Sequence, residues 1–511
     1  MADAARKLVF GTIVEVEAEP VARVRPVNRQ QFRMLNIDID QLIPDDHAAR
    51  AIWDFVGQLG LSAFYGKVKA VEGRAGQPPF DPRLMISIWV YGISRGISSA
   101  RALAAWCEWE PGLPWLCAMD EVNYHSLSTF RTAHSEALEQ LFTDVLGVLS
   151  AEGLVKLERV TVDGTRIRAV SSNEGFRAGA KLEAHLEAVA KHIEALEVEP
   201  EEVQNQRQQA ARERVRRERQ QQVIAARQTL EQLQQERGER AAATVQLSVT
   251  EQEARVMKQP GGGFAPSYNL QLATDSQAKI VVAALLSNSG SDTGLLADVL
   301  DEVQQHCGAL PEQVLVDGGY VSADNVVKTE QRQVELVGPI ANTAAAANKQ
   351  AQHRGVSAEY FKEAFRYDAE SDSYECPAGK TLVHIKQRQR EGGRVEHEYR
   401  AKLSDCAGCA HKRECCPQAK TCGRTIARSE PIAPVQAFRD RMQSEDYRQL
   451  YRKRSEVAEF PNAWLKEKLG LRRFRLRGLR KAGIESLWAV ITYNIQQWIR
   501  LVHRPQAAAA A

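Results

Sequence analysis

The first 150 residues repeat apolar side chains at helical spacing. The segments DHAARAIWDFVGQLGL and RLMISIWVYGISRGISSARALAAWC carry this period, which is typical of amphipathic helices. Asp81 and Pro82 precede the second segment in the way expected of a helix start. Ser126 or Ser128 is a candidate cap for the helical pair that follows. The pattern predicts an all-α domain over residues 1–150, either a plain bundle or a DNA-binding module.

Apolar β-branched runs begin near Leu157 and predict strands. Two of them, VTVDG and VLVDG, end in an Asp-Gly pair at Asp163 and Asp317, so each predicts a buried strand that presents a carboxylate at its end. The segment SYNLQLATDSQAKIVVAALLSNS predicts a strand hairpin and DTGLLADVLDEVQQHC a helix. A helix SADNVVKTEQRQ and a strand VELVGPI follow. Alternating strands and helices of this kind indicate a mixed α/β sheet.

One Asp-Gly pair after a strand is usually a turn. Two copies within one sheet pattern favour carboxylates that are placed for chemistry, and a third acidic segment, YRKRSEVAEFPNAWLK, surrounds Glu459. Three converging carboxylates can hold hard divalent cations through oxygen, and such ions suit phosphoryl transfer. Asp275 falls in an expected hairpin turn and Asp292 at an expected helix cap, so each has a sufficient structural explanation.

A long polar stretch separates the two Asp-Gly strands. Residues 173–258 are rich in Glu, Gln, Arg and Ala, with recurring Leu and Ile, and Pro200 divides the stretch. This composition predicts a helical hairpin or a coiled coil. A spacer or dimerisation arm is the favoured interpretation over an arm that lies on DNA.

The chain after residue 424 is expected to be helical to its end. Two helices are predicted, VQAFRDRMQSEDYRQLYRKRSEVAEF and IESLWAVITYNIQQWIRLV, the second with apolar residues on one side. Between them, LRRFRLRGLRK (Leu471 to Lys481) is dense in arginine. Such a run suits a phosphate backbone, and a solvated helix face is an equal alternative.

Length and composition narrow the class of protein. A chain of 511 residues is expected to form roughly two to four domains, and its composition is that of a globular protein. No apolar segment is long enough to span a bilayer, and charges interrupt the N-terminal apolar stretch, which argues against a signal peptide. We therefore expect a cytoplasmic protein whose nine cysteines do not form disulfides.

Six of the nine cysteines lie in residues 346–424. Four of them could supply the thiolates that tetrahedral zinc prefers: Cys376, Cys406, Cys409 and Cys415. The spacing favours a two-part structural zinc ribbon, and a set of unligated thiols is the alternative. Competing ligands are Cys416, Cys422 and His411. The three cysteines in apolar helical contexts, expected in the core, are Cys107, Cys117 and Cys307.

These motifs, in this order, resemble the DDE transposases of bacterial insertion sequences, most closely the IS1182 group within the wider IS4/IS5-like assemblage. The similar segments run over nearly the whole chain: FDPRLMISIWVYGISRGISSARAL, VTVDGTRIRA, SYNLQLATD, LVDGGY, YECPAGKTL with CAGCAHKREC, and EFPNAWLKEKLGLRRFRLRGLRKAGIESLWAVITYNI. The resemblance implies an α/β RNase H-like core in residues 155–345, interrupted by the helical insertion. A cysteine-rich, zinc-ribbon-like insertion would follow, and residues 425–505 would complete the core with helices.

The resemblance also implies a catalytic site. Two aspartates and one glutamate, Asp163, Asp317 and Glu459, would bind two Mg²⁺ or Mn²⁺ ions. One ion would activate the water that attacks the phosphodiester at the end of the element, and the other would stabilise the leaving 3′ oxygen. The freed 3′-OH would then attack target DNA.

Related transposases carry Tyr, Arg, Glu and Lys at set spacings around the glutamate. Tyr451, Arg454, Glu459 and Lys466 fit, except that four residues instead of three separate Arg454 from Glu459. Because proline breaks a helix interior, Pro461 predicts that a helix starts or kinks near Glu459. Tyr451, Arg454 and Lys466 would hold phosphates beside the metals. The arginines expected to grip the DNA backbone nearby are Arg472, Arg473, Arg475 and Arg477.

The implied function is a DNA transposase that cuts at the ends of its insertion sequence and joins the 3′-OH to target DNA. The implied partners are the terminal inverted repeats and the target duplex, and a homodimer is expected because two ends are handled together. One alternative is an RNase H-like nuclease without strand transfer. Another is a non-catalytic DNA-binding protein descended from a transposase, against which the presence of all three acids argues.

Overall fold

The structure is a computed structural model. It describes residues 5–9, 12–16, 36–68, 70, 78–198, 206–237, 246–339, 343–389, 395–418, 421–430 and 432–510. The chain divides into two compact units, Met1–Leu42 and Ile43–Ala511. In the first unit, β1 (Ala5–Val9) pairs antiparallel with β2 (Thr12–Val16). The expectation of an all-α N-terminal part is therefore wrong for this hairpin, whose second strand, TIVEV, is rich in β-branched residues.

The described α-helices of residues 48–151 confirm the helical prediction for the rest of this region. They are α1 (Ala48–Gly57), α2 (Ser62–Tyr65), α3 (Pro82–Ser94), α4 (Ala100–Trp106), α5 (Gly112–Leu116), α6 (Tyr124–Ala133) and α7 (Ser135–Ala151). Asp81 caps α3, because its carboxylate accepts the backbone N–H of Arg83 at 2.7 Å. Asn123 caps α6 by accepting the N–H of Ser126 at 2.9 Å, so the assignment of this cap to Ser126 or Ser128 is wrong.

A six-stranded mixed sheet forms the centre of the second unit. Its strands are β3 (Arg159–Arg168), β6 (Arg255–Lys258), β7 (Phe264–Asp275), β8 (Val281–Ser287), β9 (Gln313–Leu315) and β10 (Glu335–Val337). The order is β10-β9-β3-β7-β6, and β8 also pairs with β7. The β10, β9 and β3 strands run parallel, and the β7 pairings are antiparallel. This mixed sheet, flanked by helices, fits the expected RNase H-like core.

Strand β3 does not end at its Asp-Gly pair. Asp163 pairs with Leu272 and Gly164 with Gln271, and the ladder with β7 continues to Arg168. The prediction that the strand ends at Asp163 is therefore wrong, because the long partner strand β7 keeps the backbone of β3 extended. The second pair lies just beyond its strand, since β9 ends at Leu315 and only Val316 separates it from Asp317.

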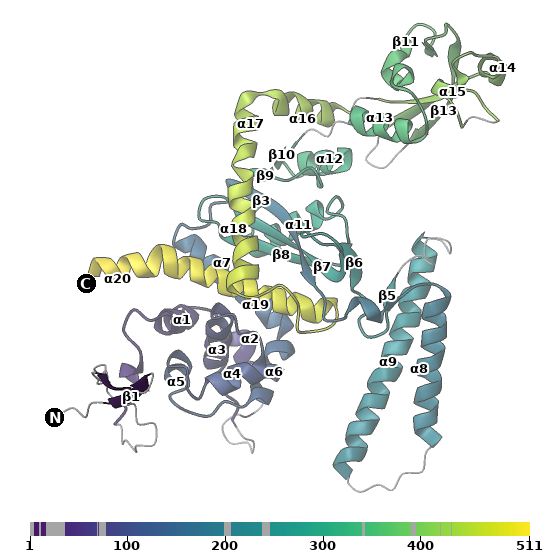
Figure 1. Ribbon diagram of the computed structural model, residues 1–511. Coiled ribbons are helices and arrows are strands. Elements are labelled where there is room, and N and C mark those ends of the chain that lie inside the picture. Colours follow the sequence, from purple (N-terminus) through teal and green to yellow (C-terminus); the bar gives the residue numbers. More distant parts are fainter. Residues whose placement is uncertain are drawn as a thin grey trace. The chain divides into compact units, whose positions relative to one another are not determined.

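The helices that flank the sheet come from two parts of the chain, the segment after β8 and the C-terminal part. The flanking helices are α11 (Leu296–Cys307), α12 (Ala323–Gln331) and α19 (Leu479–Trp498). Helix α19 contacts β8, α3 and α7, and Figure 1 shows it running between the sheet and the N-terminal helices. Its apolar residues were predicted on one side, but nearly all of its residues from Ile484 to Trp498 are buried. The prediction fails because α19 is covered from several sides at once.

The insertion within the core is a pair of long helices, α8 (Ala180–Val198) and α9 (Gln206–Arg237). They lie side by side (Figure 1), which is one of the two arrangements that the sequence left open. Strands β4 (Phe176–Arg177) and β5 (Leu247–Ser248) pair at their base. The expected boundary at residue 258 is too late, because β6 at the end of this stretch belongs to the central sheet.

The cysteine-bearing segment forms a second sheet. After α13 (Thr343–His353), five antiparallel strands follow one another in chain order. They are β11 (Arg366–Asp368), β12 (Ser373–Glu375), β13 (Thr381–Gln389), β14 (Val395–Ala401) and β15 (Thr425–Ser429). Short helices α14 (Leu403–Ala407) and α15 (Lys412–Cys415) lie between the last two strands.

The long helix predicted before Phe460 is three helices. They are α16 (Ala433–Gln443), α17 (Glu445–Arg452) and α18 (Arg454–Ala463). The break before α17 comes at Ser444, which caps α17 through the N–H of Tyr447. Of the two alternatives near Glu459, a start or a kink, the helix start is wrong, because α18 begins at Arg454 and passes through Pro461. The helix changes instead to a π turn at Trp464–Lys468, a feature that often accompanies functional sites.

A last helix, α20 (Arg504–Ala510), follows the π turn Ile499–His503. Within the described ranges, none of the helices combines the length and the apolar character that crossing a membrane requires.

Candidate active site

Asp163 lies in the middle of β3 and faces helix α18. Its Oδ1 accepts a hydrogen bond from Arg454 Nη2 at 2.8 Å, and its Oδ2 accepts one from Asn462 Nδ2 at 2.8 Å. Arg454 and Asn462 stand eight residues apart, about two helical turns, so both contacts come from neighbouring parts of one helix face. The helix that carries Glu459 is therefore docked on the strand that carries the first predicted aspartate.

Arg454 connects Asp163 to Asp317. Its Nη2 also lies 4.0 Å from Asp317 Oδ2. The Arg454 side chain is only 14% exposed, against 22% for Asp163 and 42% for Asp317. Asp317 is further fixed by the N–H of Gly319, which donates to its Oδ1 at 2.7 Å. The fold thus brings both predicted aspartates to one cation.

The surroundings of Asp163 disfavour its charged form. Burial raises the pKa of Asp163, the negative charges of Asp317 and Asp292 raise it further, and Arg454 opposes them. Burial is the largest of these effects, and Arg454 offsets it only in part. An additional cation would be electrostatically favoured there.

Asp292 is a carboxylate that sequence reasoning missed. Helix α11 begins at Leu296, so the assignment of Asp292 as its cap is wrong. A Cβ atom at Gly164 would lie 2.8 Å from Asp292 Oδ1, so the residue after Asp163 has to be glycine for this approach. A glycine inside a strand often marks such a close approach, and that signal in VTVDG was available from the sequence.

Glu459 stands beside this group and not within it. The residue is exposed on α18, and no hydrogen bond or ion pair joins it to the part of the chain that the structure describes. It precedes Asn462 by three positions, which makes the two side chains neighbours on a helix surface. Across the described ranges, no three His, Cys, Asp or Glu side chains converge tightly enough to hold a metal ion.

Tyr451 and Lys466 lie within electrostatic reach of the aspartates. Burial raises the pKa of Tyr451, and the charges of Arg454, Asp317 and Asp163 also act on it. Burial lowers the pKa of Lys466, with Arg472 adding to the effect and Asp163 opposing it. Lys466 lies in the π turn, so its spacing of seven residues from Glu459 does not place the two side chains on one regular α-helical face.

The arginine-rich loop continues the end of β3. The N–H of Arg168 donates to the carbonyl of Arg472 at 3.2 Å, and the N–H of Phe474 donates to the carbonyl of Arg168 at 2.9 Å. Phe474 is buried against Tyr268 and anchors the loop. The predicted DNA-contacting arginines are all exposed: Arg472, Arg473, Arg475 and Arg477.

Two of these arginines already have partners within the chain. Arg472 forms an ion pair with Glu467, and Arg475 Nε donates to Ser98 Oγ at 2.7 Å. Buried Glu485 accepts the backbone N–H groups of Arg475 and Leu476. The loop is therefore held in place by its backbone, while its guanidinium groups remain at the surface.

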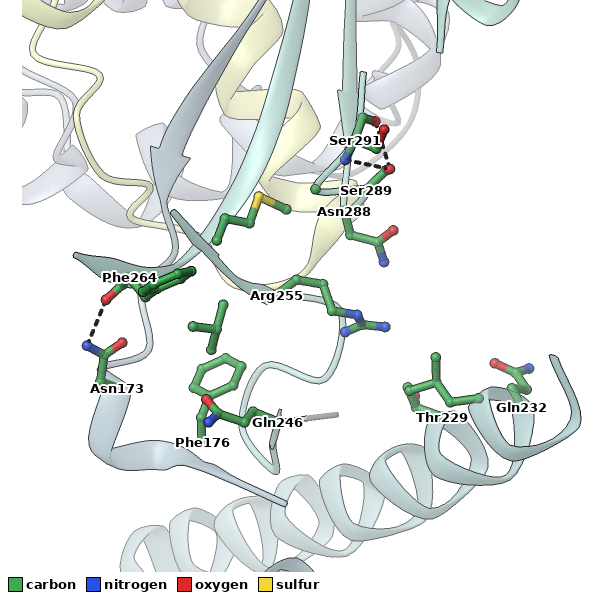
Figure 2. Close-up of a pocket in the computed structure, with 14 residues that line it drawn as sticks. Asn173, Phe176, Thr229, Gln232, Gln246, Arg255, Phe264, Asn288, Ser289 and Ser291 are labelled. Atoms are coloured by element: carbon green, nitrogen blue, oxygen red, sulfur yellow. Dashed lines mark hydrogen bonds between the residues drawn. The ribbon is translucent and has the colours of Figure 1, made fainter. Parts of the chain in front are cut away.

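An open groove of 1140 Å³ lies between helix α9 and the edge strand β6. Figure 2 shows its mixed lining, in which polar side chains stand beside Phe176 and Phe264; Asn173 donates to the carbonyl of Phe264, and Ser289 and Ser291 are in contact. Arg255 is the cationic residue of this lining. The groove ends at the loop of residues 288–291, and the next residue along the chain is Asp292.

The cysteines of the second sheet share a small cavity. It has a volume of 30 Å³ and is lined by Cys376, Cys406, Cys409, Cys415, Cys416 and His411. Backbone N–H groups point at two sulfurs, that of Lys380 at Cys376 Sγ (3.3 Å) and that of Arg424 at Cys406 Sγ (3.4 Å). Burial raises the pKa of the Cys415 thiol to about 12.

Three cysteines lie outside the second sheet. Cys107 and Cys117 are buried among the helices, which confirms them as core residues, whereas Cys307 is partly exposed.

The aspartates fit a divalent ion by their donor chemistry. Asp163 and Asp317 offer carboxylate oxygens to a shared cation, and Arg454 Nη2 already occupies a position between them. Asn462 Oδ1 is buried and has no hydrogen-bond partner, so it is a further oxygen without an assigned role. Oxygen donors of this kind suit Mg²⁺ and Mn²⁺.

Comparison with known proteins identifies the class. A family model described as "Transposase DDE domain" matches residues 375–499, and one described as "Transposase domain (DUF772)" matches residues 37–133. The chain is therefore a DNA transposase with a DDE-type core. This pair of domains is typical of IS1182-family DDE transposases.

Other comparisons add little. A search of curated proteins finds no match. A solved structure, "Cryo-EM structure of piggyBac transposase synaptic complex with hairpin DNA (SNHP)", is similar over 88% of this chain and 80% of that chain, with 10% sequence identity and a TM-score of 0.22. A TM-score this low carries no argument about the site. Asp163 and Asp317 lie outside both matched segments, whereas Glu459 and the arginine-rich loop lie inside one of them.

Proposed function

We propose that this transposase cuts DNA at the ends of its own element and joins the freed 3′-OH to target DNA, with Asp163, Asp317 and Glu459 holding divalent ions. The observation that carries the proposal is the bridge formed by Arg454 between Asp163 and Asp317. A cation already bound between two carboxylates, on the helix that carries Glu459, marks the place where a metal ion would be held.

Bound ions would supply positive charge beside the attacking and leaving oxygens of the phosphodiester. The chain's own residues would perform the positioning. Glu459 would turn toward the aspartates from its place next to Asn462, and Arg454 would exchange a carboxylate for a DNA phosphate. Tyr451 and Lys466 would hold neighbouring phosphates, since both lie close enough to Asp163 for its charge to raise their pKa.

The DNA backbone would continue past the site along β3. The arginine-rich loop joins the far end of this strand at Arg168, five residues beyond Asp163, or about 17 Å in an extended strand. Exposed Arg472 and Arg473 would therefore meet phosphates several nucleotides from the cut, with an affinity that falls as salt rises. Two element ends must be processed together, so a homodimer on DNA is part of the proposal.

The test uses duplexes that carry one inverted-repeat end, with Mg²⁺ or Mn²⁺. Asp163→Asn, Asp317→Asn and Glu459→Gln should each reduce cleavage by at least about a thousandfold and leave DNA binding intact. Glu456→Gln, an exposed neighbour on α18, is the matched control and should cut normally. Cleavage retained by any of the three variants removes that residue from the site. Cleavage without joining would favour a nuclease.

We also propose that the cysteine cavity holds a structural zinc ion through Cys376, Cys406, Cys409 and Cys415. The shared cavity and the N–H groups directed at two of the sulfurs support this assignment, since such donors stabilise thiolates. The side chains would have to close further around the ion. Elemental analysis of protein purified without chelator should find about one zinc per chain, and its absence would favour unligated thiols.

A further inference from the structure

The loop between β8 and α11 presents Asp292 in a fixed orientation. Its Oδ1 accepts a hydrogen bond from Asn269 Nδ2 at 2.7 Å and another from Gln271 Nε2 at 2.9 Å. Both amides stand on β7 and are almost completely buried. The hydroxyl of Tyr320 donates to Gln271 Oε1, so the amide of Gln271 is oriented with its N–H groups toward Asp292. One oxygen of Asp292 is therefore held by neutral donors.

The same loop is tied to the loop that carries Asp317. Thr293 Oγ1 donates to the carbonyl of Gly319 at 2.7 Å, and Asn325 Nδ2 donates to the carbonyls of Thr293 and Tyr320, both at 2.6 Å. These bonds connect the segments after β8 and after β9. The two carboxylates are consequently fixed relative to each other by protein contacts that do not involve their charges.

The free oxygen of Asp292 points to the space beside Asp317. A Cβ atom at Gly319 would lie 2.9 Å from Asp317 Oδ1 and 3.7 Å from Asp292 Oδ2, so both oxygens border one small volume that glycine leaves open. On the other side, Asp292 Oδ1 closes over Gly164, the neighbour of Asp163. Asp292 thus lies close to Asp317 and to the chain neighbour of Asp163, although the three carboxylates do not converge tightly on one point in the described ranges.

The charge at this place is unbalanced within the part of the chain that the structure describes. Arg454 contacts Asp163 and Asp317, but no cationic side chain in the described ranges pairs with Asp292. Neutral donors anchor one oxygen of Asp292, and its other oxygen lies near Asp317 beside Gly319. Such anchoring is what a preorganised metal ligand requires.

We propose that Asp292 is a ligand of the divalent-ion centre, offering Oδ2 beside Asp163 and Asp317 while Asn269 and Gln271 hold Oδ1. The inference rests on the proposed function, because it concerns the ions of that same site. The sheet then supplies three carboxylates from rigid positions, and Glu459 is the movable one on α18. Asn269, Gln271 and Tyr320 are positioning residues that act through Asp292.

Mn²⁺ binding by the full-length protein without DNA tests the inference apart from activity. Free Mn²⁺ is followed by electron paramagnetic resonance during titration of wild type, Asp292→Asn, Asp163→Asn and Asp298→Asn. Asp298 is an exposed residue on α11, so its variant makes the same charge change outside the site. Asp292→Asn and Asp163→Asn should each weaken binding at least about tenfold, and Asp298→Asn should remain within about twofold.

The outcomes separate the two proposals. Normal affinity in Asp292→Asn together with weakened affinity in Asp163→Asn would overturn the role of Asp292 and leave the proposed function standing. Normal affinity in both variants would remove the metal site itself. If Asp292→Asn does not fold, Fe²⁺-directed backbone cleavage of the wild-type chain replaces it. Cuts near residues 163, 292 and 317 support the ligand set, and cuts near 163 and 317 alone refute it.

Discussion

Replacing Gly164 with alanine tests the packing of the site directly. Gly164 lies in the middle of β3 with an ordinary extended backbone, so alanine meets no conformational penalty there. Its Cβ atom, however, would lie 2.5 Å from Gln271 Nε2, 2.8 Å from Asp292 Oδ1 and 3.1 Å from Asn269 Oδ1. All three atoms belong to the group that orients Asp292, so the strain of a single methyl group falls on that group.

The magnitude follows from these distances. Gln271 Nε2 would have to retreat by about 0.9 Å to reach an ordinary contact of 3.4 Å, and it is hemmed in by Tyr320 and by its own strand. Overpacking of a tight interior costs about 1–3 kcal/mol. A shift of Asp292 by a comparable distance should also weaken Mn²⁺ binding about 10–100-fold, the usual effect of disturbing groups that orient a metal ligand.

The assay compares Gly164→Ala with Gly147→Ala. Gly147 stands on α7, and a Cβ atom there meets nothing within 4 Å, so alanine should stabilise the helix by about 0.5–1 kcal/mol. Thermal unfolding followed by circular dichroism should shift down for Gly164→Ala and up for Gly147→Ala. Mn²⁺ titration should separate the two variants as well. Unchanged Tm and unchanged Mn²⁺ affinity in Gly164→Ala would refute the close approach of Asp292.

Three further predictions concern the cation, the pH and the salt. Arg454→Gln should destabilise the metal-free protein by about 1–3 kcal/mol, because two partly buried carboxylates lose their shared cation, and Mn²⁺ should restore most of the Tm; an unchanged metal-free Tm contradicts this. Arg454 lowers the pKa of Asp163 against the effect of burial, and only the ionised carboxylate binds Mn²⁺. As the pH falls, Arg454→Gln should therefore lose Mn²⁺ at a higher pH than wild type does. Coincident pH profiles would show that Arg454 does not act on Asp163. Replacing both Arg472 and Arg473 with glutamine should reduce the slope of log affinity for DNA against log salt by about 0.9 per lost phosphate contact, whereas Arg504→Gln on α20 should leave that slope unchanged; an equal slope in all three proteins would place the loop off the DNA.

The sequence by itself predicted the strands that carry Asp163 and lead to Asp317, because local signals agreed there. The β-branched runs before Asp163 and Asp317 favour strands, and the order of strands and helices between them predicts a mixed sheet. The cap at Asp81 was also predictable from the sequence, since an acidic residue directly before proline is typical of a helix N-terminus. These features depend on neighbours along the chain.

Other features depended on partners far away in the chain. The sequence predicted that the strand ends at Asp163, but β7 pairs across the Asp-Gly pair and keeps β3 extended to Arg168. Asp292 looked like a helix cap, and only the amides of Asn269 and Gln271, brought by another strand, place it at the site. Local patterns cannot reveal such long-range contacts, because the same residues also fit a local role such as a helix cap.

What the sequence determined by itself is the inventory: two aspartates on strands, an acidic helix, an arginine-rich run and the family resemblance that links them. Only the tertiary structure decided that Asp163 and Asp317 share the cation of Arg454. It also decided that Asp292 lies near them, whereas Glu459 makes no hydrogen bond or ion pair with this group in the described ranges. The physical reason is that electrostatic balance at a site is set by distance and burial through space, and both are fixed by how β3, β7 and α18 pack.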